Sequence, residues 1–325
     1  MIQVVKYNNN FLDQWEEFVL QSNNGTIFQL QTFLSYHISK KIQDSSLIFL
    51  RKGKIIAVLP GAIKNKNNFF SHPGASFGGI VYNKLSYNES VAILQAFHQF
   101  CRDNKINQIT MIPSPPVYHN LYDQTLDYAM LKEGYAAKES YFSSIIQINN
   151  DIDTQIESIT SNKGRGVNYY NEIINQHNLE LIWENDFEKF YPILVENKKI
   201  HHSMPTHTEE ELKAIDQLLP NRLNLLIIKK NNTVIGGTLI FTANLNTGII
   251  FYNMIDYEYK KLQPATIQIF ESIKWAQKEG LKFLDLGVSQ KPKSKNPMEP
   301  HKDLITFKEQ FGSTGILRTA FKKKY

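Results

Sequence analysis

The sequence predicts an α/β protein, of the α+β kind, built from two similar halves. Segments with apolar residues at helical spacing alternate with short extended apolar runs, which is the pattern of mixed sheets flanked by helices. The chain has 325 residues, a length at which one hydrophobic core usually gives way to two domains. A weak internal repeat places the same order of elements in both halves.

Composition excludes several classes of protein. With 42% hydrophobic and 21% charged residues, the chain is not disordered, collagen-like or a disulfide scaffold. Its one cysteine, Cys101, allows no internal disulfide and no cysteine-built zinc site. No apolar run approaches the roughly 18 residues that span a bilayer, and residues 1–10 lack the charged-then-apolar layout of a signal peptide. We therefore expect a cytoplasmic protein.

Periodicity predicts the elements of the first half. We expect strands at 2–6, 77–82 and 108–112, helices at 9–20, 29–38 and 86–103, a hairpin of 47–52 with 54–63, and a closing pair of extended segments at 136–148. Ser86 and Glu89 have the spacing of a capping box, so the third helix should begin there. Pro113 prevents the strand before it from continuing. Gly78 and Gly79 should form a tight turn or a bulge, because glycine permits positive φ.

The second half shows a similar order. We expect helices at 151–160, 166–176, 186–200 and 264–278, strands at 179–183, 248–254, 283–286 and 316–323, and a hairpin of 223–230 with 233–242. A further helix should start at Thr208 or its neighbour, because three glutamates follow where the helix dipole favours negative charge. The polar stretch 149–153 marks the expected boundary, which predicts domains at 1–150 and 151–325.

Two matches between the halves suggest a duplicated unit. Residues 47–52 align with 225–230 at an offset of 178, and residues 100–109 align with 275–284 at an offset of 175. The matches occur in the same order along the chain. We interpret them as a duplication, and chance similarity between hairpins is the alternative.

The excess positive charge lies at the end of the chain. Residues 288–325 carry 9 basic and 3 acidic side chains and net +6, whereas the rest of the chain nets −1. Such a segment would attract a phosphate-bearing or nucleic-acid partner. A solvated lysine-rich end that keeps the protein soluble is the alternative.

Several common catalytic motifs are missing from the sequence. The sequence has no dinucleotide fingerprint, no GxxxxGK loop and no nucleophile elbow, so it does not support hydride transfer, NTP hydrolysis or serine hydrolysis.

A cluster of histidines is the first of four features that remain. His201, His202 and His207 can transfer protons or line a substrate site, and ordinary loop histidines are the alternative. With no spaced carboxylate or cysteine nearby, we expect no metal site.

The other three features follow in the last 41 residues. Asp285 ends a buried strand, where it could act as a base, bind a substrate or cap the next loop. The loop 290–301 is either a lid over an anionic substrate or simply mobile. Lys308 lies beside Phe307 and Phe311 on a short helix that should end at Gly312. Its cation could stabilise an oxyanion or a phosphate, and a solvated lysine is the alternative.

Taken together, these stretches resemble the tandem GNAT-type acyltransferases related to the Fem aminoacyltransferases, which attach amino acids to peptidoglycan precursors. The stretches that carry the resemblance are the basic 163–165, the histidine segment 201–208, the hairpin end 235–237, the strand end 285–287 and the block 307–312, with 25–29 and 77–79 in the first half. The resemblance implies two tandem GNAT-like domains, each a mixed twisted sheet flanked by helices, and transfer of an acyl or aminoacyl group onto an amine.

The resemblance also implies a donor substrate and no tightly bound cofactor. The donor is aminoacyl-tRNA in the Fem branch and acyl-coenzyme A (acyl-CoA) in most single GNAT domains. In the stretch that matches the coenzyme A loop, Gln263 replaces a glycine and Pro264 removes an N–H donor, which makes coenzyme A less expected. Lys260, Lys261 and Gln263 are the candidate donor-binding residues.

These observations predict a site between the halves, at the strand ends of the second half. His202, His207 and Asp285 are candidate bases for the acceptor amine, and Lys308 is the candidate oxyanion group. The candidate substrate-binding residues are Lys163, Arg165, His201, Thr208 and Tyr252. We expect the first half to be a scaffold on the acceptor side and the second half to be the donor side.

The expected acceptor is an amine of a cell-envelope precursor or of a sugar, with charged tRNA as a possible partner. Two other functions are left open. One is a non-catalytic binding protein on a degenerate GNAT fold, and the other is a tRNA-binding or nucleic-acid-binding protein.

Overall fold

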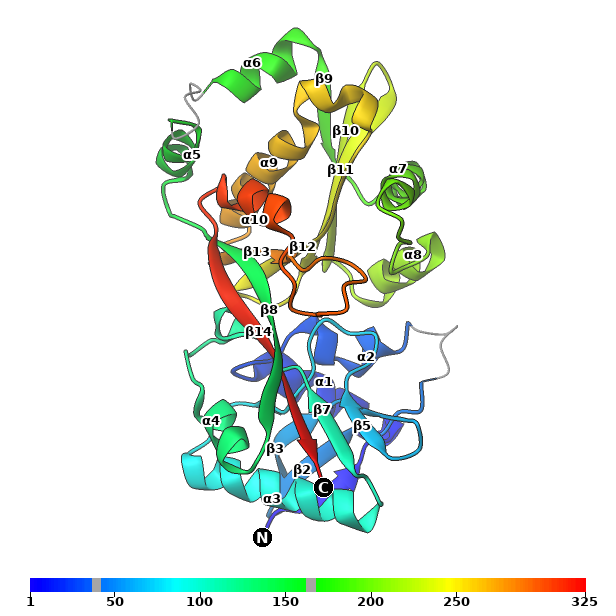
Figure 1. Ribbon diagram of the computed structural model, residues 1–325, viewed down its shortest axis with the longest axis vertical. Coiled ribbons are helices and arrows are strands. Elements are labelled where there is room, and N and C mark those ends of the chain that lie inside the picture. Colours follow the sequence, from blue (N-terminus) through cyan, green and yellow to red (C-terminus); the bar gives the residue numbers. More distant parts are fainter. Residues whose placement is uncertain (37–41, 162–167) are drawn as a thin grey trace. The chain divides into compact units, whose positions relative to one another are not determined.

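The computed structural model describes residues 1–36, 42–161 and 168–325, and the chain divides into two compact units (Figure 1). Unit 1 consists of Met1–Phe142, Gln290–Glu299 and Ile316–Tyr325, and unit 2 of Ser143–Ser289 and Pro300–Gly315. These bounds differ from the predicted domains 1–150 and 151–325. The strand β8 (Ala136–Gln147) enters unit 2 before the polar stretch is reached, and the end of the chain returns to unit 1.

Unit 1 contains strands in two sheets. One sheet has the strand order β1-β2-β3-β6, and all its neighbouring strands are antiparallel. The other has the strand order β4-β5-β7-β14-β8, in which β5 and β7 are parallel. The strands are β1 (Gln3–Lys6), β2 (Leu47–Arg51), β3 (Lys54–Leu59), β4 (Ala62–Lys64), β5 (Asn68–Ser71), β6 (Val81–Tyr82), β7 (Gln108–Met111) and β14 (Thr314–Lys324). The last strand, β14, pairs antiparallel with β7 of unit 1.

The core of unit 1 forms around the helix α3. The helical elements of the unit are η1 (Asn9–Phe11), α1 (Leu12–Gln21), η2 (Ile27–Gln29), α2 (Gln31–Leu34), α3 (Tyr87–Asp103), η3 (Pro116–Tyr118) and α4 (Thr125–Lys132). Ser86 and Glu89 form the predicted capping box at the start of α3. Leu94 and Phe97 are fully buried in one core cluster with residues of β2, β3 and β7. Cys101 lies in the same cluster, and burial raises the pKa of its thiol to about 12, so it is not a thiolate near neutral pH.

Unit 2 is one mixed sheet with helices on both faces. Its strand order is β8-β13-β12-β11-β10-β9, antiparallel except between β12 and β13. The strands are β9 (Leu179–Trp183), β10 (Leu223–Lys230), β11 (Thr233–Thr242), β12 (Thr247–Ile255) and β13 (Phe283–Val288). The helices are α5 (Ile152–Ser161), α6 (Tyr169–Gln176), α7 (Phe187–Ile200), α8 (Glu209–Leu218), η4 (Tyr257–Leu262), α9 (Pro264–Lys278) and α10 (Lys302–Glu309).

Two adjacent glycines in β11 let helices approach both faces of this sheet. A Cβ on Gly236 would lie 2.4 Å from Gln268 Nε2 of α9, and a Cβ on Gly237 would lie 2.6 Å from the ring of Phe190 in α7. Successive residues of a strand point to opposite faces, so α9 and α7 cover opposite faces of the sheet, as Figure 1 shows. The glycines at the predicted hairpin end therefore have a packing role.

Replacing Gly237 with alanine is expected to destabilise the protein by about 1–3 kcal/mol, because the added methyl group overpacks a fully buried site. Urea unfolding measures the change. The double variant Gly237→Ala with Phe190→Leu should lose less than the sum of the two single losses, since the smaller side chain removes the clash. Strict additivity would show that contact with Phe190 is not the cause.

Most elements of the second half follow the prediction, and four elements of the first half do not. The strands β9, β10 and β11 and the helix α9 begin and end at the predicted residues, and Thr208 caps α8 as predicted. The expected strand 54–63 is split into β3 and β4, which belong to different sheets. The expected strand 77–82 is reduced to β6, because Gly79 adopts a φ of 77°. The expected pair of extended segments at 136–148 is one strand, β8. The expected helix 29–38 is replaced by the short η2 and α2, and 37–41 lie outside the described residues. The duplication stays a prediction.

Candidate active site

The pairing between β12 and β13 ends early in unit 2. The two parallel strands pair only as Thr247–Ile249 with Phe283–Asp285. β12 continues to Ile255 and β13 to Val288, and register shifts interrupt both the β11–β12 and the β8–β13 pairs. Ligands bind at the carboxyl ends of strands in open α/β sheets, and bulges are frequent beside active sites. The end of β13 is therefore the candidate site.

Lys308 brings a buried cation to this end of β13. Phe307 of its helix α10 and Phe311, which follows the helix, pack into the core of unit 2. Lys308 itself is 6% exposed. Its Nζ donates hydrogen bonds to the carbonyl oxygens of Gly287 at 2.6 Å and Val288 at 3.2 Å, and to Ser289 Oγ at 2.9 Å. The ammonium is thus directed at the end of β13, and a solvated lysine is excluded.

Burial alters the acidity of this ammonium. Loss of solvation lowers the pKa of Lys308 to about 8, and the nearby negative charge of Asp285 opposes the decrease. A group with this pKa is mostly protonated at pH 7 and loses its proton in mildly basic solution. Lys308 can therefore supply positive charge to a developing oxyanion at neutral pH.

Asp285 anchors the same end of β13 through its own hydrogen bonds. Its side chain is 1% exposed, and its Oδ1 accepts hydrogen bonds from Ser143 Oγ and from the Gly287 N–H, both at 2.7 Å. Gly287 adopts a φ of 75°, a conformation that favours glycine. The carboxylate thus holds the irregular end of β13, where the register with β8 shifts between Asp285 and Val288, and lies close enough to Lys308 to affect its pKa. Of the predicted site residues, Asp285 and Lys308 are brought together.

The three predicted histidines occupy different environments. His201 follows α7 and is exposed, with its Nε2 3.0 Å from the hydroxyl of Tyr257. His202 is also exposed and has a φ of 49°, and its N–H donates to Lys199 O at 2.9 Å. His207 is 2% exposed. His201 and His202 are exposed to solvent, whereas His207 is part of a buried network.

His207 and Tyr252 form this network on the side of the sheet covered by α7. The hydroxyl of Tyr252 lies 3.1 Å from His207 Nδ1 and accepts hydrogen bonds from the N–H groups of Thr206 at 3.1 Å and His207 at 3.3 Å. Burial raises the pKa of Tyr252 to about 12, so its hydroxyl stays protonated. Thr208, the next residue, is the N-cap of α8 and forms a capping box with Glu211. These contacts hold the histidine segment against β12.

Replacing Tyr252 with phenylalanine is expected to cost about 1–3 kcal/mol of stability, because the buried N–H of His207 and the part-buried N–H of Thr206 lose their acceptor. The matched control is Tyr257→Phe, which removes the hydroxyl from an exposed pair with His201 and should change stability by less than about 0.5 kcal/mol. Thermal unfolding of both variants measures the difference. Equal effects would show that the Tyr252 hydroxyl does not support the segment.

Lys198 is a candidate that sequence analysis missed. Its Nζ lies 5.5 Å from the ring centroid of Tyr252, and burial lowers the pKa of this amine. The sequence signal that could have identified it is its spacing from Leu194. Lys198 follows the buried Leu194 by four residues and so lies on the same face of the helix. A second cation therefore lies beside the His207 and Tyr252 network.

The predicted donor-binding residues lie at the junction of η4 and α9. Lys260 and Lys261 are exposed in η4, and Gln263 adopts a left-handed φ of 59° as the N-cap of α9. Pro264 supplies no N–H, and the Thr266 N–H donates to Gln263 O at 3.0 Å. At this helix start, one N–H group that would hold a pyrophosphate is missing and another already donates a hydrogen bond within the protein. This agrees with the expected departure from a coenzyme A loop.

Two predicted substrate-binding residues, Lys163 and Arg165, lie outside the described residues. In the part of the chain that the structure describes, no group of three or more His, Cys, Asp or Glu side chains is placed to hold a metal ion. Among the same residues, no helix combines the length and the apolar character needed to cross a bilayer.

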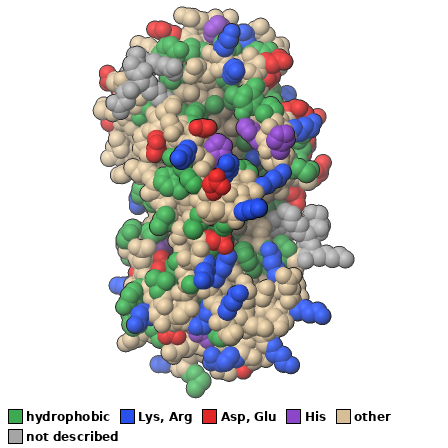
Figure 2. Space-filling model, in the orientation of Figure 1, with side chains coloured by type: hydrophobic (Ala, Val, Ile, Leu, Met, Phe, Trp, Pro, Cys, Tyr) green, Lys and Arg blue, Asp and Glu red, His purple; other side chains and the backbone are tan. Residues whose placement is uncertain are grey.

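The basic end of the chain makes many contacts inside unit 1. Arg318 donates to Ser76 O and lies over the ring of Phe77, and Lys322 pairs with Glu139. On the face shown in Figure 2, Lys and Arg side chains are spread over unit 1 rather than gathered in one patch. These contacts weaken the argument for the basic end as a nucleic-acid surface.

The long loop before α10 is held by its own contacts. Lys291 pairs with Glu299 at 3.2 Å, and the carboxylate of Glu299 also accepts from Ser294. Met298 Sδ lies 3.3 Å from the N–H of Ser140. The loop is thus more than a mobile connection, and its role as a lid stays a prediction.

Comparisons with known proteins identify the fold. A scan of protein-family models and a search of curated proteins gave no match. Among solved structures, FemX is 12% identical with a TM-score of 0.73, over 99% of this chain and 97% of that one. The C-terminal domain of a putative lysylphosphatidylglycerol synthetase from Agrobacterium fabrum is 8% identical with a TM-score of 0.58, over 98% and 93%. A tandem GNAT protein from the clavulanic acid biosynthesis pathway is 8% identical with a TM-score of 0.53, over 100% and 98%. The protein therefore has a Fem-like tandem GNAT fold.

Proposed function

We propose that the protein transfers an acyl or aminoacyl group onto an amine, with the chemistry at the end of β13 in unit 2. The observation that carries the proposal is the buried Lys308 ammonium at the end of that strand, where the β12–β13 ladder has already stopped. The fold shared with FemX and with a tandem GNAT protein supports the reaction class.

The proposed reaction is a nucleophilic acyl transfer. The neutral acceptor amine attacks the carbonyl carbon of the donor, a C–N bond forms, and the carbonyl oxygen becomes an oxyanion. Collapse of this intermediate breaks the bond to the leaving group, a thiol for acyl-CoA or a ribose hydroxyl for aminoacyl-tRNA. The proton lost by the amine passes through a base to the leaving group.

The residues of unit 2 have distinct proposed roles. Lys308 stabilises the oxyanion, and Asp285 positions the strand end and favours the protonated form of Lys308. His202 is the base that is accessible to solvent, while His207, Tyr252 and Lys198 shape a neighbouring part of the site.

The donor and the acceptor are proposed at the level of chemical class. The start of α9 supports aminoacyl-tRNA ahead of acyl-CoA, because Pro264 and the hydrogen bond of Thr266 leave fewer N–H groups for a pyrophosphate. The proposed acceptor is an amine of a cell-envelope precursor or of a sugar. Both donors occur in the cytoplasm, which is the proposed location.

Replacing Lys308 with methionine tests the proposal. Purified protein is incubated with charged tRNAs or acyl-CoA and a panel of amines, and mass spectrometry detects the modified amine. Lys308→Met should lower turnover about 10²–10³-fold, the usual loss for an oxyanion group. The matched control is Lys302→Met, which changes an exposed lysine of the same helix and should leave turnover unchanged. Equal turnover by the Lys308 variant would remove it from the mechanism.

A non-catalytic binding protein is the second candidate. It is favoured by the engagement of Lys308 Nζ with three oxygen atoms of the protein itself. Thermal-shift measurements with the same donors and acceptors distinguish the two functions. Stabilisation by an amine acceptor together with no turnover for any donor would favour binding alone.

A further inference from the structure

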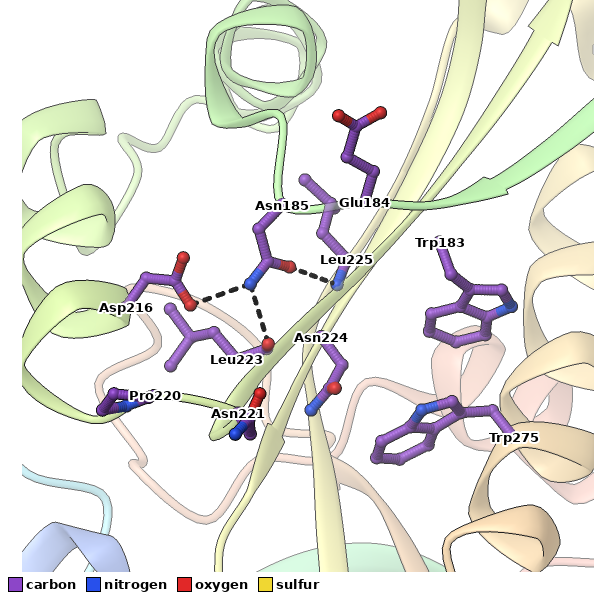
Figure 3. A pocket seen from close by; sticks show the side chains of 10 residues that line it. All are labelled: Trp183, Glu184, Asn185, Asp216, Pro220, Asn221, Leu223, Asn224, Leu225 and Trp275. Carbon is purple, nitrogen blue, oxygen red and sulfur yellow. Dashed lines mark hydrogen bonds between the residues drawn. The ribbon is translucent and has the colours of Figure 1, made fainter.

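A pocket in unit 2 lies away from the end of β13. It has a volume of about 420 Å³, within the range of roughly 300–1,000 Å³ that is usual for ligand pockets, and is shown in Figure 3. It forms beside the first residues of β10, where β9 has left the sheet. Because β10 and β12 both pair antiparallel with β11, β10 runs in the same direction as β12 and β13. The pocket therefore lies at the end of the sheet opposite the end of β13.

Two tryptophans line one wall of the pocket. Trp183 is the last residue of β9, and Trp275 lies near the end of α9. Their ring centroids are 5.7 Å apart with an interplanar angle of 22°, so the rings are stacked. Trp183 is 38% exposed although tryptophan usually buries most of its surface. Figure 3 shows both rings on one side of the pocket.

The neighbouring edge of β10 is already closed by a side chain. Asn185 donates to Leu223 O at 2.9 Å and to Asp216 Oδ1 at 2.8 Å, and its Oδ1 accepts from the Leu225 N–H at 3.0 Å (Figure 3). The N–H of Glu184 donates to Leu225 O at 3.0 Å. A peptide strand would compete with these bonds, so the pocket does not favour strand addition.

The charged lining of the pocket is acidic. Glu184 and Asp216 contribute carboxyl groups, and among the described residues that line it there is no lysine or arginine. Burial raises the pKa of Asp216, and the hydrogen bond from Asn185 opposes that increase. Asn224 contributes an amide whose Nδ2 donates to Thr242 Oγ1 at 3.0 Å. Phosphates and carboxylates are therefore disfavoured, while hydroxyl and amine groups find acceptors.

We propose that this pocket binds a pyranose sugar that carries no acidic group. One face of a pyranose ring consists of C–H groups, which pack on an aromatic surface, and its rim consists of hydroxyls. The exposed ring of Trp183 receives the apolar face, Trp275 supports that ring by stacking on it, and the amide of Asn224 receives the hydroxyl or amine groups. Two rings stacked on each other do not form the aromatic box that encloses a quaternary ammonium ion. The proposal does not depend on the transferase reaction.

Intrinsic fluorescence gives a direct test. The chain has three tryptophans, of which Trp183 and Trp275 line the pocket and Trp15 is fully buried in unit 1. The full-length protein is titrated with glucose, glucosamine and N-acetylglucosamine up to about 10 mM, ten times a Kd of about 1 mM. We expect a saturable change in emission with at least one of these sugars and none with glucuronic acid. No saturable change with any of the three sugars would overturn the proposal.

Variants locate the site by saturation-transfer NMR, which observes the sugar and does not need the tryptophan signal. Trp183→Ala should weaken binding about tenfold and Trp183→Phe less, because phenylalanine keeps a smaller flat ring. The control is Tyr128→Ala, which removes an exposed aromatic side chain of unit 1 and should leave the Kd unchanged. Circular dichroism checks that each variant is folded. Unchanged binding by folded Trp183→Ala, or stronger binding of glucuronic acid, adenosine or choline than of any sugar, would overturn the assignment.

Discussion

Replacing Lys308 with methionine is expected to remove a gain in stability that the unchanged protein shows as the pH rises from about 8 to about 10.5. Burial lowers the pKa of Lys308 to about 8, compared with about 10.5 in an unfolded chain. Between these values the unfolded state binds more protons than the folded state, so the free energy of unfolding increases with pH. The total gain is on the order of 3 kcal/mol.

The measurement is urea unfolding at several pH values from 7 to 10.5, about the limits of this window. The difference between the two proteins isolates Lys308, because tyrosines and other lysines titrate in both. The variant Lys302→Met, changed at an exposed position of the same helix, should keep the pH dependence of the unchanged protein. A constant difference between Lys308→Met and the unchanged protein would mean that the ammonium is not buried in solution.

Replacing Asp285 with alanine is expected to cost about 3–5 kcal/mol, the largest loss of stability among the substitutions considered. The change leaves the hydroxyl of Ser143 and the N–H of Gly287 without their acceptor and removes the carboxylate near Lys308. Asp285→Asn keeps an acceptor oxygen and should lose less stability. It should also lower the pKa of Lys308 further, because the favourable negative charge is gone.

Unfolding in urea measures the loss, and the pH dependence of stability reports the change in the pKa of Lys308. The exposed Asp303, in the first turn of α10, provides the control, and Asp303→Ala should have a small effect. If Asp285→Asn were as destabilising as Asp285→Ala, charge rather than the acceptor oxygen would account for the loss. An unchanged pKa of Lys308 in both variants would contradict the proposed coupling of the two residues.

Local patterns predicted unit 2 better than unit 1. The β10–β11 hairpin and α9 have long periodic runs with clear turns, so their bounds follow from neighbouring residues alone. The segment before β6 is governed by the positive φ of Gly79 and by the hydrogen bond from Gly78 N–H to Ile112 O, 34 residues away. No local pattern reports such a partner.

Only part of the candidate site was predicted from the sequence, because local patterns report neighbouring residues and not distant partners. Asp285 and Lys308 follow from local signals, a strand end and a helix face, and the structure places them together. The partner of Asp285 is Ser143, which lies 142 residues away, and the pocket wall joins Trp183 to Trp275 across 92 residues. These pairings depend on the order of strands in the sheet.

The sequence by itself determined the kinds and order of most elements, the capping boxes at Ser86 and Thr208, and two of the charged groups at the end of β13. Each of these depends on residues a few positions apart, where helix and strand periodicity act directly. Only the tertiary structure decided that the last strand pairs with β7, that the Lys308 ammonium is buried, and that two tryptophans share one wall. These features arise from burial and from contacts between distant segments, which form only when the sheet closes around its core.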